Sequence, residues 1–455
     1  MLKEKILFYI EHKDMEALKG LLSDAEDMEI LYAFHDLSSE EQVIVFRLLT
    51  KDNALSIFEE LDTDMQQNLL RSFTDERAIE FVNELAPDDR VKLLDELPAT
   101  VAKKLIASLS PEERAATNIL MGYELETAGR IMTTEYISLK KDIVVEQALA
   151  KVRKQAKDKE TIYTLFVTDN SKKLEGVLSL KELLMADGDS SVEDTMTKNA
   201  IKVSTDTDQE EVARILKELD LLAIPVVDKE DRLVGIVTID DAVDILEEEA
   251  TEDIYNQAGL VNITGKEADR SVVLVNGSMW KIWKVRLPFL IITLAAGLIA
   301  GVLIGGFEEA LESIAVVAIF IPLIMDMGGN VGTQSSTVFA RGVVLGHIQV
   351  KSFLKHFFKE IGIGFSMGVL IGVVAGIIAA VWHWQDMPLI GLAVGLALVV
   401  TMTLAALLGF LVPYVLIKFN VDQAAGSAPI ITSIKDIVGL VIYFAFVSAF
   451  LGHMM

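Results

Sequence analysis

Two polar positions in the apolar C-terminal part of this chain could bind a cation. Asp436 lies in the run Thr432-Ser-Ile-Lys-Asp-Ile-Val-Gly439, and Asn330 lies in the run Gly328-Gly-Asn-Val-Gly-Thr-Gln334. A carboxylate inside a membrane is costly, and it is usually kept because an ion or a proton passes it. Residues four apart share a helical face. The sequence therefore predicts two polar faces that line one path, with these candidate residues: Asp436, Asn330, Thr432, Gln334 and Gly329.

The mixture of one carboxylate with amide and hydroxyl oxygens favours Mg²⁺ over other metal ions. Mg²⁺ binds oxygen and gives up its water reluctantly, whereas Ca²⁺ needs more oxygen ligands and Zn²⁺ favours His or Cys clusters. The six histidines are scattered along the chain. Two alternatives stay open: Lys435 or a structural hydrogen bond could neutralise Asp436, and Asp326 could be a pore acid or a helix-end contact. The glycines of residues 328–332 are expected to loosen their helix and free backbone carbonyls.

Runs of carboxylates before the apolar part could bind further cations. Asp241, Asp244 and Glu248 lie at i, i+3 and i+7, on one helical face. Like charges this close destabilise a helix, and divalent cations would compensate; a solvated acidic surface is the alternative. The predicted cation sensor comprises Asp88, Asp89, Asp206, Asp208, Glu210, Glu211, Asp241, Asp244, Glu247, Glu248, Glu249, Glu252 and Asp253.

Five apolar stretches must position the pore residues. They span residues 287–306, 312–338, 353–381, 387–416 and 427–451, and each exceeds the roughly 18 residues needed to cross a membrane. Lys and Arg gather on one side of these spans, which places the N-terminal region in the cytosol and the C-terminus outside. Before them, residues 279–286 alternate Trp with Lys and Arg, and this predicts an interfacial helix at the cytosolic membrane surface.

Two stripes of glycine follow the spacing of helix packing seams. Gly297, Gly301 and Gly305 lie four apart in the first span, and the third span repeats the pattern at Gly364, Gly368, Gly372 and Gly376. Small residues at this interval let helix backbones approach closely. The stripes are therefore predicted to hold either one bundle or a dimer together.

The part before the spans is strongly acidic. Residues before Trp280 hold 32 Lys and Arg against 59 Asp and Glu, and the whole chain has a formal charge of −26. This argues against nucleic acid as a partner and favours cations. The chain has no cysteine, which excludes disulfides, thiolate metal sites and cysteine nucleophiles. No secretory signal begins the sequence, so this region is expected in the cytosol, and no catalytic residues are predicted.

A phrase recurs every 24 residues near the N-terminus. It begins at Leu37, Leu61, Leu85 and Leu109, and each copy continues with a capping residue or proline and acids. Short helices that cannot bury a face alone must stack, which predicts an α-solenoid over residues 1–128. The helix starts are expected at these caps and first-turn prolines: Ser38, Asp62, Pro87, Ser110 and Pro111.

Residues 129–250 contain a second duplication. Leu165–Ser179 matches Ile224–Thr238 without a gap, and each copy reads as strand, turn, strand and helix start, opened by Met132-Thr or Met196-Thr. The pattern resembles a tandem pair of CBS domains. The resemblance implies a site for ATP or another adenine nucleotide at the hydroxyl and acid after the second strand, although Glu182 departs from the usual Asp or Asn. The alternative is a module that only transmits conformational change. The implied nucleotide residues are Thr238, Asp241, Ser179 and Glu182.

The whole arrangement resembles the MgtE family of magnesium transporters. The most specific elements are Gly329-Asn-Val-Gly-Thr-Gln334, Thr251-Glu-Asp-Ile-Tyr255 and Thr432–Gly439. The resemblance implies a multidomain membrane protein. Its parts would be an acidic α-helical superhelix (1–128), an α/β tandem CBS module (129–250), a plug or connecting helix (251–285) and a five-helix pore domain (286–455).

The resemblance also implies a function. The protein would be a homodimeric, Mg²⁺-selective channel that imports Mg²⁺ across the plasma membrane, in contact with lipid. Asp436 would bind Mg²⁺ through water and Asn330 would lie along the pore. Cytosolic Mg²⁺ would bridge the acidic interfaces and shut the pore. The fifth span of the family often starts Asp-Pro-Ala, and Asp422-Gln-Ala stands here.

Several alternatives remain at this point. A secondary divalent-cation transporter, coupled to H⁺ or Na⁺ and regulated by CBS domains, fits the same residues, and Mn²⁺ or Co²⁺ could pass beside Mg²⁺. A CBS-regulated anion channel fits poorly, because the second and fifth spans offer acids and amides. An intramembrane aspartyl protease using Asp326 and Asp436 would need a Gly-x-Gly-Asp signature, which the sequence lacks.

Overall fold

The computed structural model divides into two compact units, Met1–Glu247 and Glu248–Met455. It describes residues 2–61, 63–72, 75–97, 99–261, 267–307, 316–349, 352–384, 387, 389–419 and 427–451. Asp62 and the Asp422-Gln-Ala start of the fifth span therefore lie outside the described residues. The domain boundaries expected at residues 128, 250 and 285 stay predictions.

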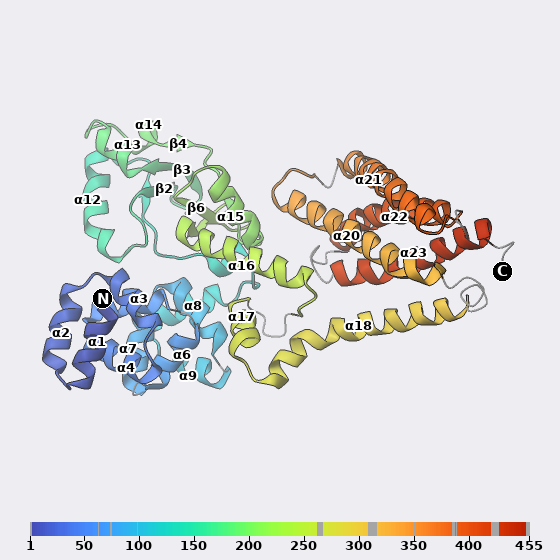
Figure 1. Ribbon diagram of the computed structural model, residues 1–455. Coiled ribbons are helices and arrows are strands. Elements are labelled where there is room, and N and C mark those ends of the chain that lie inside the picture. The colour runs from blue at the N-terminus through green and yellow to red at the C-terminus, as the bar shows by residue number, and fades with distance from the viewer. Residues whose placement is uncertain are drawn as a thin grey trace. The chain divides into compact units, whose positions relative to one another are not determined.

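The N-terminal part of the first unit is a stack of short helices, as the 24-residue repeat predicts (Figure 1). Four phenylalanines, Phe34, Phe46, Phe58 and Phe81, lie in its core, and the last three contact one another edge to face. The helices are α1 (Leu2–Glu11), α2 (Met15–Asp24), α3 (Asp27–His35), α4 (Ser39–Leu48), α5 (Lys51–Glu59), α6 (Thr63–Ser72), α7 (Asp75–Glu84), α8 (Pro87–Glu96), α9 (Ala99–Ser108) and α10 (Pro111–Leu120).

One side-chain hydrogen bond recurs with the 24-residue period. The sixth residue of each phrase sits in the first turn of a helix and donates its side-chain N–H to a carbonyl eight residues earlier, near the end of a preceding helix. Orphan carbonyls at a helix end are thus satisfied by the next repeat. The four bonds are Gln42 to Phe34 (3.0 Å), Gln66 to Phe58 (2.7 Å), Arg90 to Val82 (2.8 Å) and Arg114 to Ile106 (3.0 Å).

The predicted helix starts are confirmed where the structure describes them. The Ser38 hydroxyl accepts from the backbone N–H of Glu41, and the Glu41 carboxylate accepts from the backbone N–H of Ser38, forming a capping box. Ser110 caps α10, and Pro87 and Pro111 stand in the first helical turn.

Two small sheets follow in the first unit. One has the strand order β1-β2-β3-β4 and the other the order β5-β6-β7. The strands are β1 (Ser138–Lys140), β2 (Thr164–Thr168), β3 (Leu174–Ser179), β4 (Thr197–Lys198), β5 (Val203–Ser204), β6 (Ala223–Val227) and β7 (Leu233–Thr238). The helices are α11 (Ala128–Ile131), α12 (Val145–Gln155), the 3₁₀ turn η1 (Ala156–Asp158), α13 (Leu180–Met185), α14 (Val192–Thr195), α15 (Gln209–Glu218) and α16 (Ile239–Gln257).

The duplication is confirmed by equal registers in the two hairpins. Thr164 pairs with Ser179 in the first copy, and Ala223 pairs with Thr238 in the second. The two copies also exchange their opening segments. Met132, which opens the first copy, lies against Gly235 of the second. Met196, which opens the second copy, lies against Gly176 of the first. A Cβ at either glycine would meet the methionine sulfur within 3 Å, so this close approach requires glycine.

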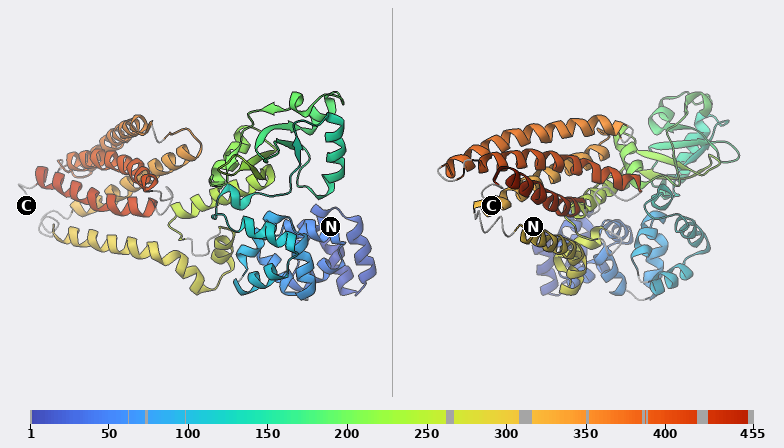
Figure 2. Two further views of the ribbon diagram at one scale, coloured as in Figure 1. Left: turned by 180° about the vertical axis from the view of Figure 1, so that it is seen from behind. Right: turned by 90° about the vertical axis from the view of Figure 1, so that its right-hand side faces the viewer.

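The second unit holds the end of α16, a short helix and five long apolar helices (Figures 1 and 2). The five predicted spans are confirmed as helices long and apolar enough to cross a membrane. The helix expected at residues 279–286 is confirmed and continues into the first span as the first turns of α18, and its position at the membrane surface stays a prediction. The elements are α17 (Glu267–Asn276), α18 (Met279–Gly305), α20 (Val316–Val344), α21 (Phe353–Trp382), α22 (Ile390–Lys418) and α23 (Ser427–Leu451).

The two glycine stripes differ in their packing contacts. The stripe of α21 packs directly on α22, where a Cβ at Gly372 would lie 2.5 Å from the Gly395 carbonyl oxygen and one at Gly376 would lie 2.7 Å from the Gly391 oxygen. This packing seam is confirmed. The stripe of α18 has no described atom within 4 Å of its would-be Cβ positions, so it makes no comparable contact within the described chain.

Candidate cation sites

Helix α20 runs unbroken through the glycine-rich stretch, so the expectation that residues 328–332 loosen the helix is wrong. The glycines serve close packing instead. A Cβ at Gly328 would lie 2.9 Å from the Thr401 methyl group, and one at Gly332 would lie 3.0 Å from Ile431. The intrahelical hydrogen bonds are kept, and α22 and α23 approach the backbone of α20 where side chains would keep them apart.

Asp436 is half-buried on α23, and its carboxylate already has a partner. The Lys435 ammonium lies 3.0 Å from Asp436 Oδ1 and donates to the Met325 carbonyl oxygen of α20 at 2.7 Å. The side chain of Lys435 is 4% exposed and that of Asp436 is 24% exposed. The alternative that Lys435 neutralises Asp436 is therefore realised in this structure, and the site contains an ion pair rather than a bare carboxylate.

The amide residues of α20 lie on an exposed face of the helix. Asn330 donates its side-chain N–H to the Asp326 carboxylate at 3.2 Å, which gives Asp326 a partner one turn away. Gln334 is also exposed, and Thr432 of α23 is half-buried. Asp326, Asn330 and Gln334 thus form a polar stripe along the outside of this single chain.

One membrane carboxylate lies outside the predicted set. Glu360 of α21 accepts a hydrogen bond from the buried Ser335 hydroxyl of α20 at 2.7 Å. A scan of the third apolar stretch for ionisable residues would have found it. The hydrogen bond compensates part of the cost of placing a carboxylate there.

The first unit gathers acids from two segments far apart in the sequence. Asp88 and Asp89 begin α8, and Asp240 and Asp241 begin α16. Asp88 interacts electrostatically with Asp241, and Asp89 with Asp240 and Asp244. Oxygen Oδ1 of Asp88 is buried and accepts no hydrogen bond from any described residue. Four of the predicted sensor residues are therefore brought together, and the sequence reading missed Asp240 and Glu160, which also interact with this group.

Charge repulsion and burial shift the pKa values of these acids upward. Burial, with Asp241 and Asp89 nearby, raises the pKa of Asp88 well above its usual value. Burial, together with the charges of Asp240 and Asp89, raises the pKa of Asp241 to about 7. The hydrogen bond from the Thr238 hydroxyl opposes this shift. Burial likewise raises the pKa of Asp89 to about 6, although Lys92 opposes the shift. A proton or a cation would relieve the repulsion.

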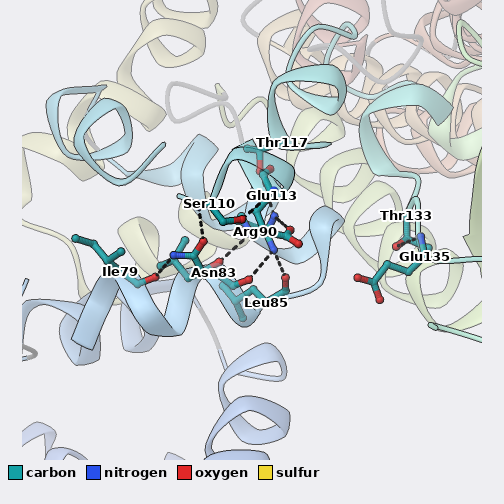
Figure 3. A network of polar contacts seen from close by, with 10 residues as sticks. Ile79, Asn83, Leu85, Arg90, Ser110, Glu113, Thr117, Thr133 and Glu135 are labelled. Atoms are coloured by element: carbon teal, nitrogen blue, oxygen red, sulfur yellow. Dashed lines mark hydrogen bonds and ion pairs between the residues drawn. The ribbon is translucent and has the colours of Figure 1, made fainter. Parts of the chain in front are cut away.

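Arg90 fixes the helix that carries Asp88 and Asp89 (Figure 3). Its guanidinium is fully buried, donates to the carbonyls of Val82, Asn83 and Leu85, and pairs with Glu113. Near the end of α8, Asp95 binds Arg130 of α11 at 2.6 and 3.1 Å. Arg90 thus ties the start of α8 to the helical stack, and Asp95 ties its end to α11.

The acids of α15 form a separate group. Asp208 caps α15 through the backbone N–H of Glu210 at 2.8 Å, and Asp206 lies 3.6 Å from the Lys229 ammonium. Glu211 is exposed. The described interactions of Asp88 and Asp241 do not include this group.

The end of α16 contacts the membrane bundle of the second unit. Asp253 lies 3.6 Å from Arg341 at the end of α20. Buried Arg270 of α17 donates to the Glu252 carbonyl and the Asn256 side chain of α16 and stacks over Tyr255. The Thr251–Tyr255 segment therefore joins α16, α17 and α20.

The hydroxyls and acids implied for nucleotide binding are engaged with each other. Thr238 donates to the Asp241 carboxylate at 2.8 Å. Ser179 donates to the Glu182 carboxylate at 2.7 Å and also caps α13. Among the residues that the structure describes, no group of three His, Asp or Glu side chains forms a ready-made metal site.

Comparison with known proteins assigns three parts of the chain. Family models match the divalent cation transporter MgtE at residues 321–446, the MgtE intracellular N domain at 25–126, and the CBS domain at 128–189 and 192–248. The chain resembles a crystal structure of the cytosolic domain of the Mg²⁺ channel MgtE in complex with ATP, at 35% identity and a TM-score of 0.52. That similarity covers 53% of this chain and 99% of the other. A second structure, the soluble part of a magnesium transporter, matches at 31% identity and a TM-score of 0.51, over 55% of this chain and 98% of the other.

Two curated relatives match most of their own length. Magnesium transporter MgtE of Bacillus subtilis is 35% identical over 336 residues, which cover 74% of this chain and 72% of that protein. Magnesium transporter MgtE of Thermus thermophilus is 36% identical over 330 residues, which cover 72% of this chain and 71% of that protein. With five apolar helices after a soluble part, this multi-pass membrane protein belongs to the MgtE family of magnesium transporters.

Proposed function

We propose that this protein imports Mg²⁺ across the plasma membrane through a path lined by α20 and α23. The observation that carries the proposal is the placement of Asp436, a half-buried carboxylate in an apolar bundle, beside the glycine-rich face of α20. The relatives named as magnesium transporters support Mg²⁺ as the ion. A single carboxylate with amide and hydroxyl oxygens nearby suits an ion that keeps most of its water. Mn²⁺ and Co²⁺ are secondary candidates.

The working form is a homodimer embedded in lipid. The polar stripe of Asp326, Asn330 and Gln334 lies on an exposed face of one chain. Polar groups facing lipid are costly, so a second copy would cover this stripe and complete the wall of a water-filled path. Five crossings would leave the two ends of the membrane domain on opposite sides, and the distribution of Lys and Arg supports a cytosolic N-terminal part and an outer C-terminus.

Cytosolic Mg²⁺ closes the path. Asp88 Oδ1 is buried and accepts no hydrogen bond from a described residue, and with its acidic neighbours it favours a bound cation. Mg²⁺ bound there stabilises the conformation in which α8 and α16 meet. Helix α16 is continuous over 19 residues. It begins at this cluster, and in its last turns Asp253 lies beside Arg341 of α20, so it offers a direct route from sensor to pore helix. The acids of α15 and the end of α16 remain candidates for further Mg²⁺ ions.

An adenine nucleotide is a second regulatory ligand. The related cytosolic domain of the Mg²⁺ channel MgtE was solved with ATP. In this chain, Thr238 and Ser179 each present a hydroxyl beside an acid at a helix start, the arrangement expected for ribose and phosphate contacts.

Flux into proteoliposomes tests the transport site. Asp436→Asn, which keeps the size of the side chain, is expected to abolish uptake of Mg²⁺, because the only full negative charge at this point of α23 is lost. The exposed Asp189→Asn is the matched control. Wild-type flux through Asp436→Asn would contradict the proposal. Flux that persists without a H⁺ or Na⁺ gradient identifies a channel, and flux that needs one identifies the coupled transporter instead.

A further inference from the structure

Lys435 is an unusually placed cation for a protein that conducts cations. Its side chain is 4% exposed and lies between α20 and α23. The ammonium makes two contacts, 2.7 Å to the Met325 carbonyl oxygen and 3.0 Å to Asp436 Oδ1. Burial of an ammonium is costly unless it is paired and hydrogen-bonded, and both conditions hold here. Lys435 thus occupies one oxygen of the carboxylate that is proposed to bind Mg²⁺.

The backbone of α20 leaves room for this ammonium. A Cβ at Gly329 would lie 2.3 Å from Lys435 Nζ, and one at Gly328 would lie 3.5 Å from its Cδ. A side chain at position 329 would require the Lys435 ammonium to move from its present place beside Asp436. Both glycines belong to the run Gly328-Gly-Asn-Val-Gly-Thr-Gln334 that the sequence singles out, so the glycines and the lysine form one structural arrangement.

We propose that Lys435 is a tethered counter-cation that occupies Asp436 between passing ions and must be displaced by each Mg²⁺. The proposal rests on the proposed transport function and names a residue that sets its affinity and charge selectivity. Lysine is suited to this role, because its point charge sits on a flexible four-carbon stem. The ammonium can leave Asp436 while the Met325 carbonyl remains as its second partner.

Competition with the ammonium discriminates between charges. A divalent ion is attracted to a carboxylate about twice as strongly as a monovalent ion at equal distance. Na⁺ or K⁺ gains no electrostatic energy by replacing an ammonium that is already there and cannot diffuse away. Mg²⁺ gains electrostatic energy by replacing the ammonium. After the ion passes, the ammonium returns to Asp436, and this competition lowers the affinity of Asp436 for Mg²⁺, which would otherwise trap the ion.

Lys435→Met tests this role, because Met keeps the length and apolar stem but removes the charge. The half-saturating Mg²⁺ concentration for flux into proteoliposomes is expected to fall by about tenfold or more, because the cation that competes for Asp436 as its ion-pair partner is lost. The maximal flux is expected to fall as well, and Na⁺ is expected to compete where it does not in the wild type. Lys435→Arg should restore the wild-type half-saturation. Lys355→Met, at an exposed lysine of α21, is the matched control.

Separate outcomes distinguish the two proposals. If Asp436→Asn transports like the wild type, the transport site itself is wrong. If Asp436→Asn is inactive and Lys435→Met keeps the wild-type half-saturation and Na⁺ exclusion, the counter-cation role is overturned. If Lys435→Met does not fold in detergent, Gly329→Ala provides the same measurement, since it displaces the ammonium while keeping its charge. An unchanged half-saturation in Gly329→Ala would then refute the role.

Discussion

At the scale of single residues, one position of the N-terminal repeat links neighbouring helices by a side-chain hydrogen bond. Gln42, Gln66, Arg90 and Arg114 each bond the carbonyl eight residues earlier. Arg90 does more than the glutamines, since it binds two further carbonyls and Glu113 while fully buried. It therefore sets the position of α8, whose first turn carries Asp88 and Asp89.

Two substitutions at Arg90 test this role, and one of them introduces the glutamine found at the equivalent positions 42 and 66. Arg90→Met is expected to lower the local stability of α8 and α10 by about 2 kcal/mol, because buried carbonyls lose their donors. Arg90→Gln should lose less, because Gln makes the equivalent bond at positions 42 and 66. Hydrogen exchange of the α8 and α10 amides in the full-length protein measures both. Equal protection in the two variants would show that the shared bond to Val82 does not matter.

At the scale of elements, helix packing depends on which glycine stripe finds a partner. Helices α21 and α22 meet along the stripe Gly364–Gly376 and lie side by side (Figures 1 and 2). The glycines of α20 and α22 also interlock, since a Cβ at Gly409 would lie 2.6 Å from the Gly332 carbonyl oxygen. Helices α20, α21 and α22 are thus held by close backbone contacts at these glycines.

Two alanine substitutions separate packing within the chain from packing between chains. Gly372→Ala is expected to destabilise the bundle by about 1–3 kcal/mol, because its Cβ would collide with the Gly395 carbonyl. Gly301→Ala meets no described atom within 4 Å and should leave the bundle intact. Thermal unfolding in detergent measures both, and light scattering follows the proposed dimer. A Gly301→Ala protein with normal unfolding but a lost dimer would assign the α18 stripe to the dimer interface.

At the scale of the whole molecule, the proposed sensing by the acid cluster would make closure depend on both Mg²⁺ and pH. The pKa values of Asp89 and Asp241 are raised to about 6 and about 7 when α8 and α16 meet. Carboxylates with raised pKa values stabilise this closed arrangement while they are protonated, and the stabilisation is lost as the pH rises through these values. Above that range the acids are ionised, and a bound cation must replace the protons.

The expected result is a change in the Mg²⁺ requirement between pH 5 and pH 8. Without Mg²⁺, the segment between α10 and α11 should resist protease at about pH 5 and be cleaved at about pH 8, as the raised pKa values imply. Added Mg²⁺ should restore protection at pH 8. The double variant Asp88→Asn and Asp241→Asn should be protected at both pH values without Mg²⁺, and exposed Asp189→Asn should behave as the wild type. If the wild-type protein is cleaved to the same extent at both pH values, the cluster is ruled out as the sensor.

Local chemistry explains why much of this protein could be predicted from its sequence. The 24-residue period rests on a hydrogen bond across eight residues, the caps act within one turn, and the two hairpins close over 15 positions with equal registers. A span is recognised by its apolar length alone. These features depend on neighbours in the chain, so the helical stack, the duplicated module, the five spans and the exceptional Asp436 were all accessible without coordinates.

Only the tertiary structure decided which distant residues meet. Asp88 approaches Asp241, and Lys435 reaches the Met325 carbonyl 110 positions away. The glycine-rich run of α20 stays helical because α22 and α23 pack against it. Two glycine stripes with the same spacing differ only in whether a partner helix lies opposite. Spacing specifies a face, whereas the identity of its partner depends on the packing of the whole bundle, and no local pattern contains that information.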